Sequence, residues 1–165
     1  MINFDSFYGV VTEINDFYTG NDENSGCYKL MTVQNRDRSI VNFVVSPVTY
    51  FVDQAMVSVG DMVTGYYDAD APVPLIYPPQ YQAIVVVRDM YEANVKVDYF
   101  NSQLVSSDGM LKINLSPYTN IMLENGQTFS ENIANRNLIV IYGASTRSIP
   151  AQTIPYEIIV ICHNK

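Results

Sequence analysis

The sequence has no tryptophan, one histidine and two cysteines among its 165 residues. Cys27 and Cys162 are too few for the disulfide framework of a small secreted domain, and they predict buried or free thiols. His163 lies near the end of the chain, where it is a poor candidate for a catalytic base, and with two cysteines it cannot complete a tetrahedral metal site. No glycine-rich phosphate-binding loop or nucleophile elbow occurs. These absences argue against nucleophilic, zinc-dependent and nucleotide-dependent catalysis.

Positive charge is also scarce, because nine Lys and Arg face 17 Asp and Glu, a net charge of −8. Phosphate binding needs basic side chains, so this balance disfavours nucleic acid as a partner. No basic residue precedes Lys29, and the densest apolar run, Ala83–Val87, is far too short to cross a bilayer. We therefore expect a cytoplasmic protein that does not enter a membrane.

Branched apolar residues are abundant: 20 Val and 15 Ile stand against 7 Leu and 8 Ala. Branching at Cβ suits the pleated surface of a sheet, whereas Leu and Ala favour helices. The composition predicts an all-β protein.

An internal repeat is visible at a short turn-like motif. Ser46-Pro47-Val48-Thr49 recurs as Ser116-Pro117-Tyr118-Thr119, and each copy follows a strand-like segment. Proline cannot donate to a sheet ladder, so Pro47 and Pro117 are each expected at a bend or bulge.

Two further segments match in the same order along the chain, at a slightly larger offset. Met62–Tyr67 resembles Asn137–Tyr142, and Tyr81–Val87 resembles Tyr156–Cys162. A five-residue insertion around Glu124-Asn125-Gly126, where Asn-Gly indicates a turn, would explain why the offset grows after the Ser-Pro motif. The pattern predicts two domains, residues 1–92 and 93–165.

Each copy is expected to contain about five strands, which in the first copy are Tyr8–Ile14, Cys27–Val33, Ile40–Val52, Met62–Tyr67 and Tyr81–Val87. A hairpin of three strands, a bent third strand and a Gly60-Asp61 turn before the fourth resemble the OB architecture, a five-stranded Greek-key barrel. The sequence therefore predicts two tandem OB-like barrels. The alternative is a single β-sandwich formed by both halves together.

The two copies differ in charge and in their loops. Residues 1–92 hold 12 acids and 4 bases, whereas residues 93–165 hold 5 of each. The first copy also has a long polar loop, residues 15–26, and a proline-rich loop, residues 68–79, which an OB barrel is expected to bring close together. The second copy replaces the first of these with little more than Phe100–Ser102.

The two long loops supply the candidate site residues. The predicted aromatic binding face consists of Phe17, Tyr18, Tyr66, Tyr67 and Tyr77. Clustered carboxylates are ligands for hard cations, and a Ca²⁺ site is the metal hypothesis. Its ligands would be Asp16, Asp22, Glu23, Asp68 and Asp70, completed by Asn21 or backbone carbonyls.

The sequence is best interpreted as a non-catalytic binding module for a small molecule or a protein, without a resident cofactor. The first alternative is a structural or self-assembling β-protein, whose strand edges and tyrosines contact other copies. The second alternative is an enzyme that uses carboxylates on a carbohydrate.

Overall fold

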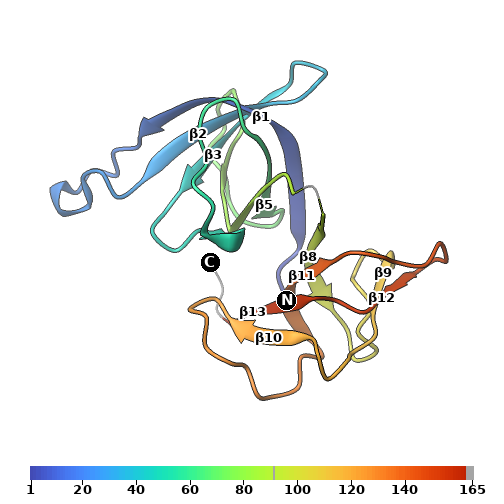
Figure 1. The fold of residues 1–165 in the computed structure, drawn as a ribbon. Helices are drawn as coiled ribbons and strands as arrows, with labels where there is room; N and C mark the ends of the chain where they lie inside the picture. The colour runs from blue at the N-terminus through green and yellow to red at the C-terminus, as the bar shows by residue number, and fades with distance from the viewer. Residues whose placement is uncertain (91, 163–165) are drawn as a thin grey trace. The chain divides into compact units, whose positions relative to one another are not determined.

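A computed structural model describes residues 1–90 and 92–162, so His163 lies outside the described residues. Over this part of the chain the regular structure is almost entirely β, with thirteen strands and two short 3-10 helices, which confirms the predicted all-β class. None of the helices described is long and apolar enough to span a membrane. Two compact units are present (Figure 1): Asp5–Asp89, the N-terminal unit, and Met1–Phe4 with the described residues from Met90 onward, the C-terminal unit.

The N-terminal unit is built on one seven-stranded sheet with the order β4-β7-β5-β1-β2-β3-β6. Its elements are β1 Phe4–Asp16, η1 Asp22–Asn24, β2 Lys29–Gln34, β3 Ile40–Val45, β4 Tyr50–Phe51, η2 Val52–Gln54, β5 Met62–Asp68, β6 Gln80–Gln82 and β7 Val85–Arg88. β1, β2 and β3 pair antiparallel, as β5 does with β7, whereas β3·β6 and β4·β7 are parallel pairs. β1 also carries a bulge between Val11 and Glu13.

Alternating side chains explain why these segments form half-buried strands. In β2, Met31 and Val33 are buried while Leu30, Thr32 and Gln34 are only partly buried, as the two-residue period of a strand requires. The buried core of the unit consists of Val11, Met31, Val33, Val41, Phe43, Val63, Ala83 and Val86. Branched side chains dominate this list because they fill a pleated interior well.

The C-terminal unit has a four-stranded sheet with the order β10-β13-β11-β8 and a two-stranded sheet of β9 and β12. Its strands are β8 Asn94–Phe100, β9 Leu111–Ile113, β10 Asn120–Leu123, β11 Arg136–Tyr142, β12 Ala151–Thr153 and β13 Glu157–Ile161. β10·β13 and β9·β12 are parallel pairs, and β11 pairs antiparallel with both β13 and β8. Within the described residues, only isolated bridges made by Val105 and Ser106 lie between β8 and β9.

The C-terminal unit has a buried core of its own. It consists of Phe100, Leu111, Ile113, Ile133, Leu138, Val140, Ile158 and Val160. Every residue of this core comes from the second half of the chain, and every residue of the first core comes from the first half.

The two Ser-Pro-X-Thr motifs form turns with the same hydrogen bonds. In Ser46–Thr49 and Ser116–Thr119 the threonine N–H donates to the serine carbonyl, at 3.1 and 3.0 Å. The threonine hydroxyls donate to the carbonyls of Ala83, at 2.8 Å, and Pro155, at 2.9 Å. Proline occupies the second position of each turn, where its fixed φ is suited. The prediction of a bend at both prolines is confirmed.

Strand hydrogen bonds also correct the predicted match of the last strand. The N–H of Ile84 donates to the carbonyl of Tyr66, at 2.8 Å, and the N–H of Tyr156 donates to that of Ile141, at 2.9 Å. These bonds keep the predicted match of β5 with β11 but place Ile84, not Tyr81, at the position of Tyr156. The predicted match of Tyr81–Val87 with Tyr156–Cys162 is therefore wrong by three residues. The physical reason is a shorter loop, eight residues (143–150) instead of eleven (69–79).

Candidate functional site

The predicted aromatic residues do not form one face. Tyr67 stacks on Tyr81, with ring centroids 3.9 Å apart and planes 9° apart, and both rings pack against the buried ring of Phe43. Burial, followed by the charge of Asp5, raises the pKa of Tyr67 above its ordinary value, so its phenol is neutral at physiological pH. Tyr67 and Tyr81 are therefore partly buried and pack against the core of the N-terminal unit.

The other aromatic candidates lie elsewhere. Tyr18 and Tyr77 are strongly exposed, and the Tyr18 hydroxyl donates to Asp22 within its own loop, at 3.1 Å. Phe17 and Tyr66 are half-buried. None of these four belongs to the Tyr67–Tyr81 stack among the described ring contacts.

The predicted carboxylates make local contacts within separate loops. Asp16 forms an ion pair with Lys29, and the side chain of Asp68 accepts the N–H of Asp70, at 3.0 Å. At η1 the side chain of Asn21 accepts the N–H of Glu23, at 3.0 Å. These are the bonds that Asp and Asn commonly form in turns.

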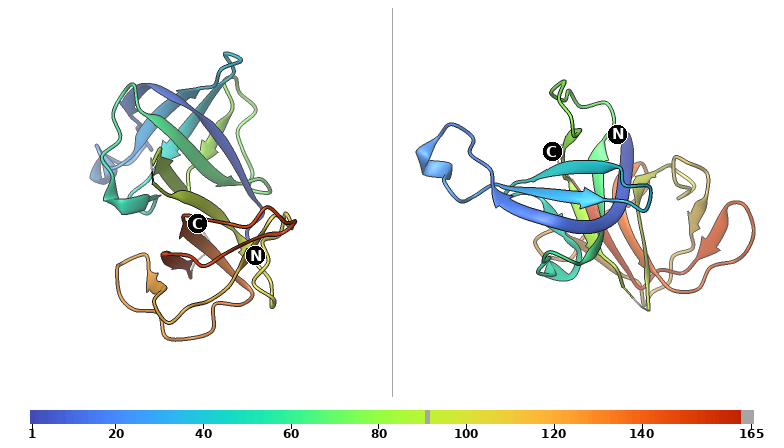
Figure 2. Two further views of the ribbon diagram at one scale, coloured as in Figure 1. Left: turned by 45° about the vertical axis from the view of Figure 1, so that its right-hand side comes forward. Right: turned by 90° about the horizontal axis from the view of Figure 1, so that it is seen from above.

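The two loops also leave the N-terminal unit in different directions. In the right-hand view of Figure 2, the blue loop with η1 extends to the left and the green loop of residues 69–79 extends to the top. Among the described residues no group of three or more His, Cys, Asp or Glu side chains could hold a metal ion. The structure therefore does not bring the five predicted Ca²⁺ ligands together, and the predicted convergence of the loops is not found.

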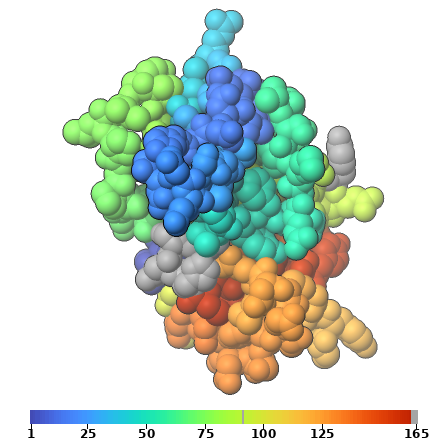
Figure 3. Space-filling view, turned by 90° about the vertical axis from the view of Figure 1, so that its left-hand side faces the viewer, coloured from blue at the N-terminus to red at the C-terminus, as the bar shows by residue number. Residues whose placement is uncertain are grey.

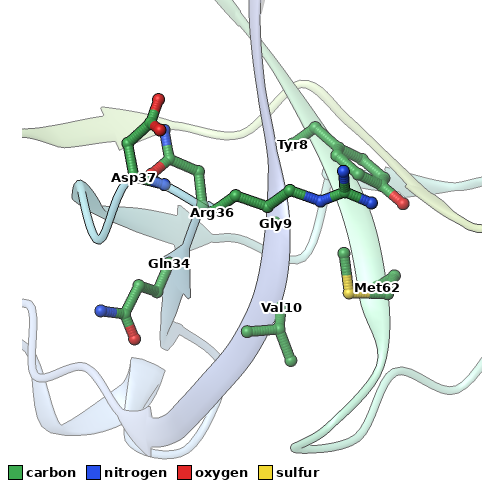
Figure 4. A pocket seen from close by; sticks show the side chains of 8 residues that line it. Tyr8, Gly9, Val10, Gln34, Arg36, Asp37 and Met62 are labelled. Carbon is green, nitrogen blue, oxygen red and sulfur yellow. Dashed lines mark hydrogen bonds between the residues drawn. The ribbon is translucent and has the colours of Figure 1, made fainter.

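A shallow groove lies instead where the β2–β3 hairpin meets β1. It encloses about 740 Å³ and is lined by Tyr8–Val10, Gln34–Asp37 and Met62 of β5. Figure 4 shows the side chain of Arg36 crossing β1 at Gly9 toward the Tyr8 ring. A Cβ at Gly9 would lie 2.3 Å from the carbonyl oxygen of Gln34, so only glycine permits this approach of the hairpin.

Hydrogen-bond donors and hydrogen-bond acceptors both line this groove. The Tyr8 hydroxyl donates to Asp89, at 2.6 Å, and this hydrogen bond is the main cause that raises the pKa of Tyr8. Arg36 is exposed and forms no ion pair with another described residue. The Asn35 side chain accepts the N–H groups of Asp37, at 3.0 Å, and Ser39, at 2.9 Å, which fixes the hairpin turn. The groove therefore contains the hydrogen-bonded ring of Tyr8, the guanidinium of Arg36 and the carboxylate of Asp37. The side-chain amides of Gln34 and Asn35 also line it.

Arg36 was not among the predicted site residues, and Tyr8 was predicted only as the first residue of a strand. One pattern in the sequence could have directed attention there: Gly9 interrupts a strand of bulky residues, as glycine does where another backbone approaches closely.

A second groove lies in the C-terminal unit beside β12. It encloses about 560 Å³ and is lined by Asn114, residues 143–146, residues 152–154 and Tyr156. A Cβ at Gly143 would lie 2.2 Å from the Tyr156 hydroxyl oxygen, so this tyrosine lies directly over the glycine. The loop is held against β12 by the bond from the Thr153 hydroxyl to the Ala144 carbonyl, at 2.7 Å.

Comparison with known proteins gives no relative: no family model, no curated protein and no solved structure matches this chain.

Proposed function

We propose that the chain consists of two OB-like barrels related by an internal repeat. In the N-terminal unit, β3 with β4 and β6 with β7 act as two bent strands that pair in parallel, while β5 lies between β7 and β1. This order supports closure as a five-stranded Greek key. The C-terminal unit repeats these pairings with β8, β9 with β10, β11, and β12 with β13. Its second strand is reduced to the bridges at Val105 and Ser106.

The proposed function is non-catalytic binding of a neutral carbohydrate in the groove of the N-terminal unit. The observation that carries the proposal is the combination, in one open groove, of the Tyr8 ring with Arg36, Asp37 and the amide-bearing Gln34 and Asn35. The C–H face of a sugar ring packs on an aromatic ring. Its hydroxyls both donate and accept, so they are matched by a lining that contains donors and acceptors.

The charge of the groove favours a neutral ligand over an anion. Arg36 is its single base, whereas Asp37 lines the groove and Asp89 holds the Tyr8 hydroxyl. The first 92 residues carry a net charge of −8, which repels nucleic acids and other polyanions. Among the described residues that line the groove, Asp37 is the only carboxylate, and the nearby Asp89 accepts the Tyr8 hydroxyl. The lining therefore supplies no pair of carboxylates for glycoside hydrolysis, which supports a binding role. We also propose a reducing compartment such as the cytoplasm, in keeping with the exposed free thiols of Cys27 and Cys162.

Screening of neutral glycans followed by isothermal titration calorimetry tests this proposal. Tyr8→Ala and Arg36→Ala are expected to weaken binding about tenfold or more, equivalent to about 1.4 kcal/mol. Tyr8→Phe keeps the ring and is expected to retain most of the affinity. Tyr18→Ala is the matched control, because it removes an exposed tyrosine from a different loop of the same unit. Failure of every neutral glycan to bind, or tighter binding of a heparin fragment, would contradict the proposal.

A further inference from the structure

The two units differ at the positions of Ile84 and Tyr156, which occupy the same place in the strand hydrogen bonding. Ile84 is 2% exposed and lines a small cavity of about 70 Å³ together with residues 71–74 of the proline-rich loop. Tyr156 is 60% exposed, and the loop before it, residues 143–150, is three residues shorter than residues 69–79 and is hydrogen-bonded to β12. The N-terminal unit thus covers with its own loop a surface that the C-terminal unit leaves open.

Apolar side chains are exposed at this uncovered surface, next to the polar residues Asn114, Thr146 and Gln152 that also line the groove. The segments around residues 115–118 and 154–156 are neighbours, since the N–H of Asn114 donates to the Thr153 carbonyl, at 2.8 Å. Leu115 and Tyr118 are exposed in the first segment, as are Ile154 and Tyr156 in the second. Exposed apolar side chains gathered in this way indicate an interaction surface.

A complementary apolar segment is exposed in the proline-rich loop of the N-terminal unit. At its tip, Leu75 is 100% exposed and Tyr77 is 80% exposed, with Ile76 between them. In Figure 3 the green segment that contains this loop protrudes at the left edge. Four prolines, at positions 72, 74, 78 and 79, restrict the loop, which lowers the entropy lost when it docks.

The charges flanking the two surfaces are opposite. Asp68 and Asp70 precede the loop tip. Arg147 follows the last groove residue of its loop, and Lys112 pairs in register with Gln152, which lines the groove. Opposite charges at the rim of an interface favour encounter and fix its orientation.

We propose that the chain self-associates head to tail, with the loop tip at residues 75–77 of one copy seated in the groove at Ile154 and Tyr156 of a second copy. The occupant has the apolar and proline-rich chemistry that already covers the matching surface in the N-terminal unit. Because loop and groove are different surfaces, the contact is heterologous, and association proceeds to closed rings or to open chains of copies. This inference does not depend on carbohydrate binding.

The test uses light scattering after size exclusion over a range of protein concentrations. Wild-type protein is expected to rise above its monomer mass of 18.6 kDa as concentration increases. Leu75→Asp, which alters the loop, and Ile154→Asp, which alters the groove, are each expected to remain monomeric. An equimolar mixture of the two variants is expected to form a dimer that grows no further, because only one intact loop and one intact groove remain.

Two controls separate docking from misfolding and from general stickiness. Circular dichroism melts of both variants should match the wild type, since both positions are exposed. Met56→Asp, at an exposed apolar residue away from the loop tip, should associate as the wild type does. Arg147→Asp should weaken association, as should added salt. A wild type that stays monomeric at all concentrations, or a mixture that fails to dimerise, overturns the inference.

Discussion

Alanine substitution at Gly9, Gly65 and Gly143 is expected to destabilise the protein by three different amounts. The new Cβ would lie 2.3 Å from the Gln34 carbonyl oxygen, 2.5 Å from the Phe43 ring and 2.2 Å from the Tyr156 hydroxyl oxygen, respectively. The expected cost follows how easily each neighbour moves, not the distance itself.

At Gly9 the obstacle is the backbone of the β2–β3 hairpin, which can yield only by disrupting the β1–β2 pairing. We expect Gly9→Ala to cost about 3 kcal/mol or more, at the upper end of overpacking losses. At Gly65 the obstacle is the fully buried ring of Phe43. The expected cost is about 1–3 kcal/mol, reduced by about 0.4–1 kcal/mol because alanine restricts the unfolded chain.

At Gly143 the obstacle is the far end of a side chain that is largely exposed and can rotate away. The free energy of unfolding is therefore expected to change by no more than about 0.5 kcal/mol. Urea unfolding followed by circular dichroism measures all three values, and a loss of about 1 kcal/mol should lower Tm by about 4–8 °C in a unit of this size. An equal loss at Gly143 and Gly9, or no loss at Gly9, would refute the reasoning.

Three further predictions concern polar contacts. Thr49→Val should cost about 2 kcal/mol of stability and Thr119→Val about 1 kcal/mol. Both variants lose a hydroxyl that donates to a carbonyl, but the Thr49 hydroxyl also accepts a backbone N–H. Equal losses in urea unfolding would contradict this. Asp98→Ala should cost about 3 kcal/mol, because this buried carboxylate accepts three hydrogen bonds; a neutral thermal melt would contradict it. Burial opposes the ionisation of Asp108, but Lys96 and other donors outweigh it and lower the pKa of Asp108. The ionised pair of Asp108 and Lys96 contributes about 0.5 kcal/mol to the free energy of unfolding, a small amount because the pair is partly exposed. This stabilisation is present above the unfolded pKa of about 3.9 and is lost as pH falls through the lower folded pKa. Lys96→Met should therefore destabilise at about pH 6, and this loss should shrink as the pH falls below about 3.9; a pH-independent difference in stability would contradict this.

Composition and local turn chemistry were sufficient to locate most strands of the first half, although the predicted strand Tyr81–Val87 is divided into β6 and β7. The predicted segments at 8–14, 40–52 and 62–67 all fall on observed strands, and Pro47 divides the second of these at a turn. Branched side chains and proline act through local sterics, so a single sequence contains their effect. The match of the last strand failed because Tyr81 and Tyr156 are alike in sequence, whereas their register depends on the length of the preceding loop.

The candidate site could not be predicted because it depends on contacts between distant segments. Gly9 and Gln34 are far apart in sequence, and their approach follows from the hairpin register. Tyr67 was assigned to a binding face from its neighbourhood in sequence, but it is partly buried and stacks on Tyr81 against the core of the unit. The convergence of the two long loops was an expectation from architecture, and loop direction is set by packing that one sequence does not reveal.

Mapping of a bound neutral oligosaccharide by ¹H–¹⁵N correlation spectroscopy tests the proposed function most directly. Titration is expected to shift the amide resonances of residues 8–10, 34–37 and 62, and to leave those of the loops at 17–28 and 69–79 unchanged. Tyr8→Ala should abolish these shifts at the same ligand concentration. Shifts confined to the two long loops, or no shifts with any neutral saccharide that the protein retains, would contradict the assignment of the groove as the binding site.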